Sequence, residues 1–463
     1  MKSILVKDII SLINGKIIIG NADEKLENFS KDTRIINKDD VYIAIKGGSF
    51  DGNKFWREAL EKGAKAVIVQ DIDFNKEDLS SFEGKTIIEV DDTLEALYKM
   101  AEYKRSLYNI PVIGVTGSVG KTSTKDIIAS VVSQKYKTLK TQGNNNNNIG
   151  LPFTILRLKD EEAAVIEMGM NHFKEISLLT RIAKPTISVI TNIGTSHIGN
   201  LGSRENILKA KLEILEGMEK PLLVINNDND LLHKYYDENK EKIEMYTYGI
   251  ENNSNIMAQN IVSEENSSTF ESTVNCEKIQ ITVPVGGNHF VLNSLCACKI
   301  GELLNIDNSK IKQGIEKFEL TNKRMDIHKL ENGITVINDA YNASYESMTA
   351  SLKYFGNLKG NRKIAVLGDM FELGEFAEEL HKKVGEEVAK NEIDMLFCAG
   401  KNAKYIYETA IEKGFNKENA YYFKDRDELL KDLKTKISSG DILILKASNG
   451  MKFYELVDKI GEM

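Results

Sequence analysis

The sequence lacks an excess of positive charge and lacks any long apolar run. Its 61 Lys and Arg residues are outnumbered by 69 Asp and Glu, and the net charge of −8 does not favour a general nucleic-acid or anionic-membrane surface. No run approaches the roughly twenty apolar residues of a membrane-spanning helix. The apolar start is interrupted by Lys7 and Asp8, so it has no core of signal-peptide length. We therefore expect a cytoplasmic protein with no nucleic-acid partner and no membrane insertion.

Cysteine is scarce, and its spacing does not match a metal site. Two of the four cysteines are only two positions apart within a helical pattern, and the other two are isolated. We expect buried thiols in a reducing compartment. The four are Cys276, Cys296, Cys298 and Cys398.

The length of 463 residues predicts about three domains. Residues 1–90 alternate short strand and helix patterns, and the run 91–93 offers an N-cap for a helix over 94–107. From residue 111 onward, apolar strands alternate with helical patterns, which predicts βαβ units in a mostly parallel sheet with helices on both faces. Residues 255–285 instead predict a small antiparallel patch, and a third βα series begins near residue 332. The predicted class is α/β, with domains 1–90, 91–320 and 321–463.

The run GVTGSVGKT, residues 114–122, is the strongest local motif. It lies between an apolar strand pattern and a helical pattern, so its backbone N–H groups and the helix dipole can hold a phosphate. It departs from the strict P-loop, because Val115 stands five residues before Gly120. The alternative is a glycine-rich turn without a ligand. The candidate nucleotide-binding residues are Gly114, Thr116, Gly117, Ser118, Val119, Gly120, Lys121 and Thr122.

Two polar residues follow predicted strands of the same sheet. Glu167 ends the strand AAVIE, and His197 follows the strand ISVITNI. Ligands of open α/β sheets bind beyond the carboxyl ends of the strands. With Thr122, this carboxylate and imidazole would suit a divalent cation near phosphates. Taken alone, each could instead be a helix cap or one half of a surface ion pair.

The chain is similar to the Mur ligases in an ordered series of segments that covers essentially its whole length. These are FSKDTR, DVYIAIKGGSFDGNKF, GVTGSVGKT, TQGNNNNNIG, VIEMGMN, TNIGTSHIG, AKLEIL, GGNHFVLN, NDAYNAS and VLGDMFELG. The resemblance implies a cytoplasmic ATP-dependent amide-bond ligase of peptidoglycan synthesis. It implies an N-terminal domain for a UDP-sugar substrate, a P-loop-type ATPase domain and a Rossmann-like C-terminal domain. The expected partners are UDP-N-acetylmuramoyl-tripeptide and D-alanyl-D-alanine, and we expect a monomer.

The resemblance also implies roles for individual residues. Lys121 would hold the β- and γ-phosphates, Thr122 one Mg²⁺ ion, and Glu167 and His197 a second. Lys211 matches the lysine that the family carbamylates, although a helix lysine is ordinarily just solvated. Asn144 and Asn147 would lie near the P-loop and the acyl phosphate, whereas composition alone would make this run a polar turn.

The remaining candidates come from the same resemblance. Asn293 would contact adenine and His289 would lie near it, while Arg324 and Asp339 would reach ATP from the C-terminal domain, with Tyr341 and Asn342 in the same cleft. Such a division implies domain closure before chemistry. The residues expected to face the UDP-sugar are Ser30, Asp32, Thr33, Arg34, Lys46 and Gly47.

Three positions depart from the family pattern. Tyr345–Glu346 replaces Pro-Asp, Lys446–Asn449 replaces Lys-Gly-Ser-Arg, and Asn53 stands where a histidine is common. These changes leave two alternatives open: a sister ligase or paralogue with another amino donor, and a catalytically silent nucleotide-binding protein. Retention of both metal positions argues against the silent protein.

Overall fold

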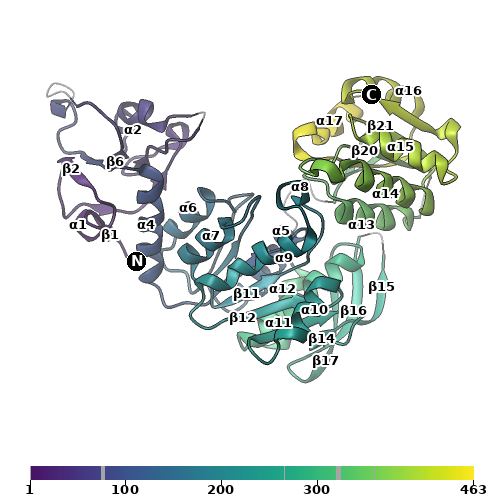
Figure 1. Cartoon of the computed structure of the whole chain (residues 1–463), viewed down its shortest axis with the longest axis horizontal. Coiled ribbons are helices and arrows are strands. Elements are labelled where there is room, and N and C mark those ends of the chain that lie inside the picture. Colours follow the sequence, from purple (N-terminus) through teal and green to yellow (C-terminus); the bar gives the residue numbers. More distant parts are fainter. Residues whose placement is uncertain are drawn as a thin grey trace. The chain divides into compact units, whose positions relative to one another are not determined.

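The α/β class predicted from the sequence is confirmed. The computed structural model describes residues 2–48, 50–74, 79–264, 266–319, 325–359 and 361–462 (Figure 1). The chain divides into two compact units. The first comprises Met1–Val115, Tyr136–Ser188 and Leu212–Leu222, and the second Thr116–Lys135, Val189–Lys211 and Leu223–Met463. The three-domain division at 90/91 and 320/321 stays a prediction.

A five-stranded sheet organises the N-terminal part of the first unit. Its central strands are the predicted apolar runs, and they pair in parallel because helical or irregular crossovers connect them. Tyr42, Trp56 and Val67 belong to the buried core against this sheet. The strand order is β2 (Lys16–Ile19), β7 (Thr86–Glu89), β6 (Ala66–Val69), β5 (Val41–Ile43) and β4 (Phe29–Ser30), of which β2 is antiparallel to β7.

The helix predicted after residue 93 is α4, Thr93–Ser106. The side chain of its N-cap, Asp92, accepts hydrogen bonds from the backbone N–H groups of Leu94 and Glu95 at 2.7 and 2.9 Å. These bonds satisfy two of the amides that a helix start leaves without partners. The predicted cap is therefore confirmed.

A seven-stranded sheet contains the strand that precedes the glycine-rich loop. Its buried strands lack the polar alternation of a half-exposed sheet, as expected of a sheet covered on both faces. Pairing of β10 with β8 and β9 is parallel, as predicted. The order is β14 (Ile256–Met257), β13 (Glu244–Gly249), β12 (Leu222–Asn226), β11 (Ile187–Ile190), β8 (Val112–Thr116), β10 (Ala163–Glu167) and β9 (Thr138–Lys140).

The predicted antiparallel patch is a three-stranded sheet within the second unit. It has the order β15 (Gln259–Ser263), β16 (Ser268–Val274) and β17 (Glu277–Val283). The long helix α11, Asn288–Leu303, begins directly after Gly287.

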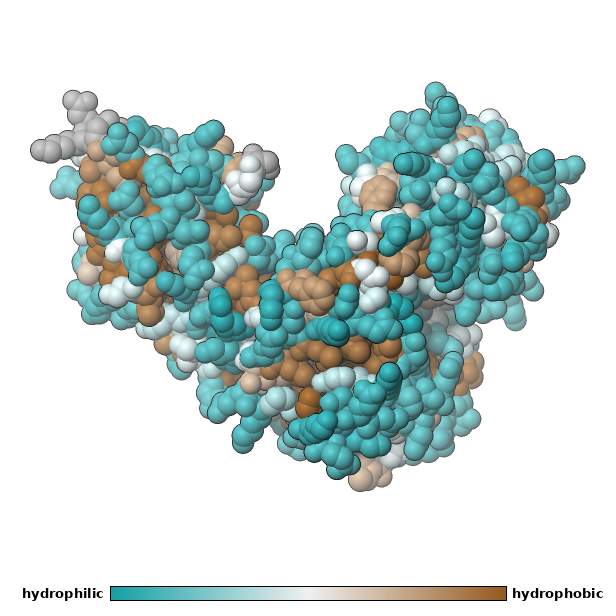
Figure 2. Space-filling model, in the orientation of Figure 1, coloured by the Kyte–Doolittle hydropathy of each residue, from teal (hydrophilic) through white to brown (hydrophobic). Residues whose placement is uncertain are grey.

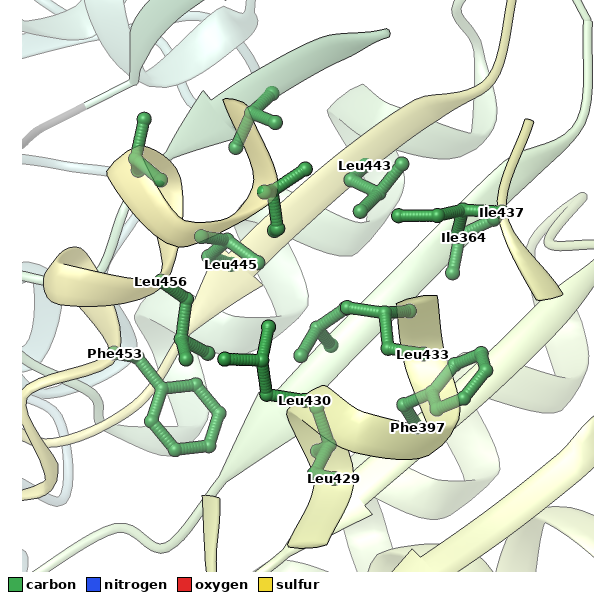
Figure 3. Close-up of a cluster of buried hydrophobic side chains, with 14 of the residues drawn as sticks. Ile364, Phe397, Leu429, Leu430, Leu433, Ile437, Leu443, Leu445, Phe453 and Leu456 are labelled. Atoms are coloured by element: carbon green, nitrogen blue, oxygen red, sulfur yellow. The ribbon is translucent and has the colours of Figure 1, made fainter. Parts of the chain in front are cut away.

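The last sheet has six strands and its own apolar core. Helix α16 (Arg426–Lys436) supplies Leu429, Leu430 and Leu433, which pack with Phe397 and Leu443 of the sheet (Figure 3). Only β18 is antiparallel to its neighbour. The order is β18 (Asp326–Lys329), β19 (Thr335–Asn338), β23 (Ile442–Lys446), β20 (Lys363–Gly368), β21 (Met395–Ala399) and β22 (Ala420–Phe423).

A buried carboxylate closes one helix end of this sheet. Asp369 directly follows β20, and it accepts hydrogen bonds from the backbone N–H groups of Lys401, Asn402 and Ala403 at 2.6–3.0 Å. Helix α15, Ala403–Glu412, begins there. The carboxylate thus satisfies amides that would otherwise attract an anion at the helix start.

The surface is predominantly hydrophilic on the face that Figure 2 shows, with scattered apolar patches. Among the described residues, no helix combines the length and apolar character needed to cross a membrane.

Candidate active site

The glycine-rich run forms a tight strand–loop–helix turn. Strand β8 ends at Thr116, and helix α5 spans Lys121–Val132 with Gly120 as its N-cap. Gly117 and Gly120 have φ angles of +152° and +79°, which side-chain-bearing residues rarely adopt. The turn can therefore expose successive amides at a helix N-terminus, the arrangement that holds phosphate groups.

Gly114 lies inside β8 rather than in the turn. A Cβ at this position would lie 3.2–3.3 Å from side-chain atoms of Pro185, Ile214 and Met168. Close packing in the sheet therefore accounts for this glycine, and its proposed place in the nucleotide site stays a prediction.

The loop is held by its own lysine and by an asparagine that the sequence analysis did not single out. The Nζ atom of Lys121 donates to the carbonyls of Gly117 and Ser118 at 2.8 and 3.2 Å. Asn192 Oδ1 accepts from the N–H groups of Ser118 and Val119 at 3.1 and 2.9 Å. Asn192 follows β11 in the TNIGTSH segment, so its position after a strand was the available signal.

Gly117→Ala is expected to weaken ADP binding by about 10–100-fold, the equivalent of roughly 1–3 kcal/mol of local strain. The new Cβ would lie 1.9 Å from Thr191 Oγ1, which itself donates to Val119 O at 2.6 Å. Calorimetric titration with ADP measures the effect. Gly414→Ala is the control, because its φ is +102° but nothing lies within 4 Å of a new Cβ. Equal ADP affinity in both variants would contradict this assignment of the loop.

The positive charge of Lys121 lowers the pKa values of both Lys211 and His197. Lys211 lies on α9, Arg204–Leu212, and only 1% of it is exposed. Burial, followed by the positive charge of Lys121, holds the pKa of Lys211 well below its usual value. Burial also lowers the pKa of His197 to about 4, with further lowering by Lys121 and Lys211 and an opposing effect of Glu372. The structure therefore brings these three predicted residues into one electrostatic neighbourhood in which the imidazole is neutral at pH 7.

Glu372 is the second residue that the sequence analysis missed. Its Oε2 atom lies 2.5 Å from Nδ1 of His197. The segment VLGDMFELG carried the resemblance without a role for its glutamate. Glu372 and His197 are 175 positions apart, so no local sequence pattern could predict their contact.

Glu167 ends β10, as predicted, and is 1% exposed. Its Oε1 atom accepts a hydrogen bond from Nδ2 of Asn146 at 2.8 Å. The neighbouring candidates lie differently: Asn144 is exposed, and Asn147 Oδ1 accepts from Gly150 N at 2.8 Å at the start of helix α6, Gly150–Leu156. Asn146, which the sequence analysis did not single out, thus contacts the candidate metal ligand.

Asn293 lies beside the first turn of α5. Thr124 Oγ1 donates to its Oδ1 at 3.0 Å, and a Cβ on Gly120 would lie 3.6 Å from the same oxygen. A side chain on α11 is therefore placed next to the phosphate loop. Its adenine contact stays a prediction.

Asp339 is held by a lysine that the sequence analysis noted only as part of a departing segment. Lys446 Nζ and Ser351 Oγ donate to Asp339 Oδ2 at 2.5 and 2.6 Å. Burial lowers the pKa of nearby His289 to about 4, which Asp339 opposes. Tyr341 is half-buried and Asn342 exposed. Arg324 lies outside the described residues.

The candidates for the UDP-sugar mostly contact one another. Asp32 accepts from the backbone N and both Nε and Nη2 of Arg34, and these bonds lower the pKa of Asp32 to about 2. Ser30 Oγ donates to Asp32 O at 3.1 Å. Thr33 is buried, Lys46 pairs with Asp71 at 2.7 Å, and Gly47 N donates to Phe50 O. Their role in substrate binding stays a prediction.

The described residues contain no group of three or more His, Cys, Asp or Glu side chains that could hold a metal ion. The predicted ligands are the hydroxyl of Thr122, the carboxylate of Glu167, the imidazole of His197 and, in its carbamylated form, Lys211. This sparse set fits Mg²⁺, which keeps several waters and binds through one or two carboxylates together with substrate phosphates.

The comparisons with known proteins agree over the whole chain. Three family profiles match: "Mur ligase family, catalytic domain" over residues 27–105, "Mur ligase middle domain" over 115–301 and "Mur ligase, glutamate ligase domain" over 323–449. The chain is 37% identical to UDP-N-acetylmuramoyl-tripeptide–D-alanyl-D-alanine ligase of Bacillus subtilis, covering 99% of this chain and 98% of the relative. It is 30% identical to the ligase of the same name from Escherichia coli, with 100% and 99% covered.

Solved structures show the same fold. MurF from Acinetobacter baumannii matches with a TM-score of 0.88 and 24% identity, with both chains covered completely. MurF ligase from Thermotoga maritima in complex with ADP matches with a TM-score of 0.80 and 27% identity, covering 94% of this chain and 97% of that one.

Proposed function

This chain belongs to the Mur ligase family, and we propose that it uses ATP to join D-alanyl-D-alanine to UDP-N-acetylmuramoyl-tripeptide. The observation that carries the proposal is the full-length likeness to relatives that bear the name of this activity. The protein is an ATP-dependent ligase of peptidoglycan precursor synthesis.

The reaction has to overcome the poor electrophilicity of a carboxylate. ATP transfers its γ-phosphoryl group to the terminal carboxylate of the tripeptide, which gives an acyl phosphate and ADP. The amino group of D-alanyl-D-alanine then attacks the carbonyl carbon. The tetrahedral intermediate loses phosphate as the C–O bond breaks and the amine gives up a proton. The protein mainly has to position and neutralise anionic groups.

The roles of the nucleotide-site residues follow from this reaction. The amides of the 117–122 loop would hold phosphates, and a phosphate would take the place of Asn192 Oδ1 at Ser118 N and Val119 N. Lys121 would lie on the β- and γ-phosphates and Asn293 on adenine. Asp339 would bind the ribose hydroxyls and Arg324 the γ-phosphate, while Asn144 and Asn147 would lie near the acyl phosphate. The contact of Asn293 with Thr124 supports its place beside this loop.

We assign the metal ligands as Thr122, Glu167 and His197, with two Mg²⁺ ions. Bound metal would neutralise charge on the phosphates. The neutral state of His197 supports its role, because only an unprotonated nitrogen can bind a metal.

Carbamylation of Lys211 is part of the same proposal. Burial and the positive charge of Lys121 lower the pKa of the Lys211 amine. A lowered pKa raises the uncharged fraction of the amine, and the uncharged amine is the form that adds carbon dioxide. The resulting carbamate would supply a second anionic metal ligand beside the carboxylate of Glu167.

The remaining assignments concern the N-terminal domain, the cellular location and the oligomeric state. We assign residues 1–90 to the UDP-sugar, with Ser30, Asp32, Thr33, Arg34, Lys46 and Gly47 as contacts, and we propose a cytoplasmic monomer. The three matched family segments support the three-domain division.

Two of the residues that depart from the family pattern, Glu346 and Asn53, have hydrogen-bond partners within the protein. Glu346 Oε1 accepts from Thr195 N at 2.7 Å, and Asn53 Oδ1 accepts from Gln70 N at 3.0 Å. Both side chains therefore have structural partners, which for Glu346 lie 151 positions away in the chain, and neither change requires another amino donor.

A phosphate-release assay tests the activity. Purified protein with ATP, Mg²⁺ and UDP-N-acetylmuramoyl-tripeptide is expected to release phosphate only when D-alanyl-D-alanine is added. A panel of amino acids and dipeptides serves as the comparison. Preference for another donor would indicate the sister ligase, and ADP binding without turnover with any donor would indicate the silent protein.

A further inference from the structure

Two segments far apart in the sequence meet at His197. The first is the loop after β11, which ends in the short helix α8, Ile198–Leu201, with His197 as its N-cap. The second is the loop after β20, which contains Glu372 and leads to the 3-10 helix η4, Gly374–Phe376. Both segments belong to the second compact unit.

The backbones of these two loops are in direct contact. Gly199 N donates to Glu372 O at 3.1 Å. A Cβ on Gly199 would lie 2.5 Å from Gly374 N, and a Cβ on Gly374 would lie 3.0 Å from Gly199 Cα. Only glycines permit this approach, so the two loops are fitted to each other.

Both partners of the side-chain contact have left-handed backbones. The φ angles are +63° for His197 and +62° for Glu372. Neither residue is a glycine, so each conformation has a free-energy cost, and such costs concentrate at functional sites. The two backbones turn the imidazole and the carboxylate toward each other, to the 2.5 Å separation of Nδ1 and Oε2.

The chemistry of the pair decides which imidazole nitrogen remains available. An ionised carboxylate can only accept hydrogen bonds, so Nδ1 of His197 is the donor. In a neutral ring Nε2 then carries the lone pair. A carboxylate on the far nitrogen of a metal-binding histidine fixes the tautomer and the ring orientation.

We propose that Glu372 is a positioning residue, whose carboxylate fixes His197 with Nε2 as its metal-binding nitrogen. The inference rests on the proposed function, because His197 is a metal ligand only within it. Its consequence is that the loop after β20, in the C-terminal βα series, orients a metal ligand that belongs to the loop after β11. Active-site assembly therefore requires both segments to be in contact.

Two measurements on the full-length protein test the inference. The Mg²⁺ concentration for half-maximal phosphate release is expected to rise about 10–100-fold in Glu372→Ala, the usual effect of losing such a partner. Glu372→Gln, whose amide oxygen can still accept from Nδ1, is expected to restore part of this loss. The KM for UDP-N-acetylmuramoyl-tripeptide should change less than about twofold, since the carboxylate acts through the histidine. Glu375→Ala is the matched control, because Glu375 is exposed three residues further on.

The second measurement does not depend on activity. In protein labelled with ¹⁵N-histidine, which has only six histidines, His197→Ala identifies the signal of His197. We expect the Nδ1–H tautomer in the unsubstituted protein and a shift toward Nε2–H in Glu372→Ala. Melting temperatures establish that the variants are folded.

The outcomes separate this inference from the proposed function. Wild-type turnover with an unchanged tautomer and an unchanged Mg²⁺ midpoint in Glu372→Ala would overturn the role of Glu372 alone. A wild-type protein without donor-dependent turnover would overturn the proposed function, and the tautomer would still report on the contact. Glu372→Ala combined with His197→Ala is expected to be no worse than His197→Ala, and additive losses would also overturn the inference.

Discussion

Lys121→Met is expected to lower the rate of phosphate release by about 10³-fold. The γ-phosphoryl group gathers negative charge as it transfers, and removing one preorganised donor from such a site costs about 10²–10³-fold in rate. A full positive charge should lie at the upper end of this range. Methionine is unbranched and only one heavy atom shorter than lysine, so the effect mainly reports the loss of the ammonium group.

The measurement is donor-dependent phosphate release at saturating ATP, accompanied by calorimetric titration with ADP. Lys310→Met is the control, because Lys310 is exposed on helix α12, Asn308–Glu316. The substituted loop also loses the two bonds from Nζ to Gly117 O and Ser118 O, so a melting curve accompanies the assay. Turnover within tenfold of the unsubstituted protein would remove Lys121 from the reaction.

Lys211→Ala is the second large effect, with an expected loss of about 10²–10³-fold, comparable to the loss of a fixed charged group in an active site. A short-chain carboxylic acid is expected to restore part of the activity, because alanine leaves room where the carbamate would stand. Lys211→Met should be equally inactive but not restored, since its side chain fills that space. Lys211→Met should also melt no lower than the unsubstituted protein, because it removes a buried amine that loses its hydration.

The matched control is Lys209→Ala, on the same helix but exposed. In ¹³C-bicarbonate, NMR should show a carbamate signal that disappears in Lys211→Ala and persists in Lys209→Ala. If that signal is absent from all three proteins, or if Lys211→Ala keeps full activity, the carbamate is not part of the reaction.

The elements with strong local patterns could be predicted from the sequence. The apolar run 163–167 is β10 to the residue, and Asp92 caps α4 as its spacing indicates. The strand–loop–helix around Gly117 and Gly120 follows from the same kind of local information. Short strands such as β9, Thr138–Lys140, and β22, Ala420–Phe423, were not predicted, because three or four residues carry too little periodicity.

Within the candidate site, side chains were harder to predict than backbone. The resemblance placed Asn144 and Asn147 near the P-loop and the acyl phosphate, but nothing in the sequence showed that Asn146 contacts Glu167. Asn147 lies three positions before Gly150, a spacing at which an asparagine side chain can accept from a backbone N–H group at a helix start. Glu372, Asn192 and Lys446 act through partners more than 70 positions away, and only the fold brings such pairs together.

Asp369 sets the C-terminal sheet apart from the dinucleotide-binding folds that it resembles in outline. In those folds the start of a helix receives a pyrophosphate. Here a side chain of the protein already occupies the start of α15, where it accepts from the first helical amide, Ala403, and from the two amides before it. The start of α15 is therefore not available to a pyrophosphate. The sheet instead supports loops such as the one that contains Glu372.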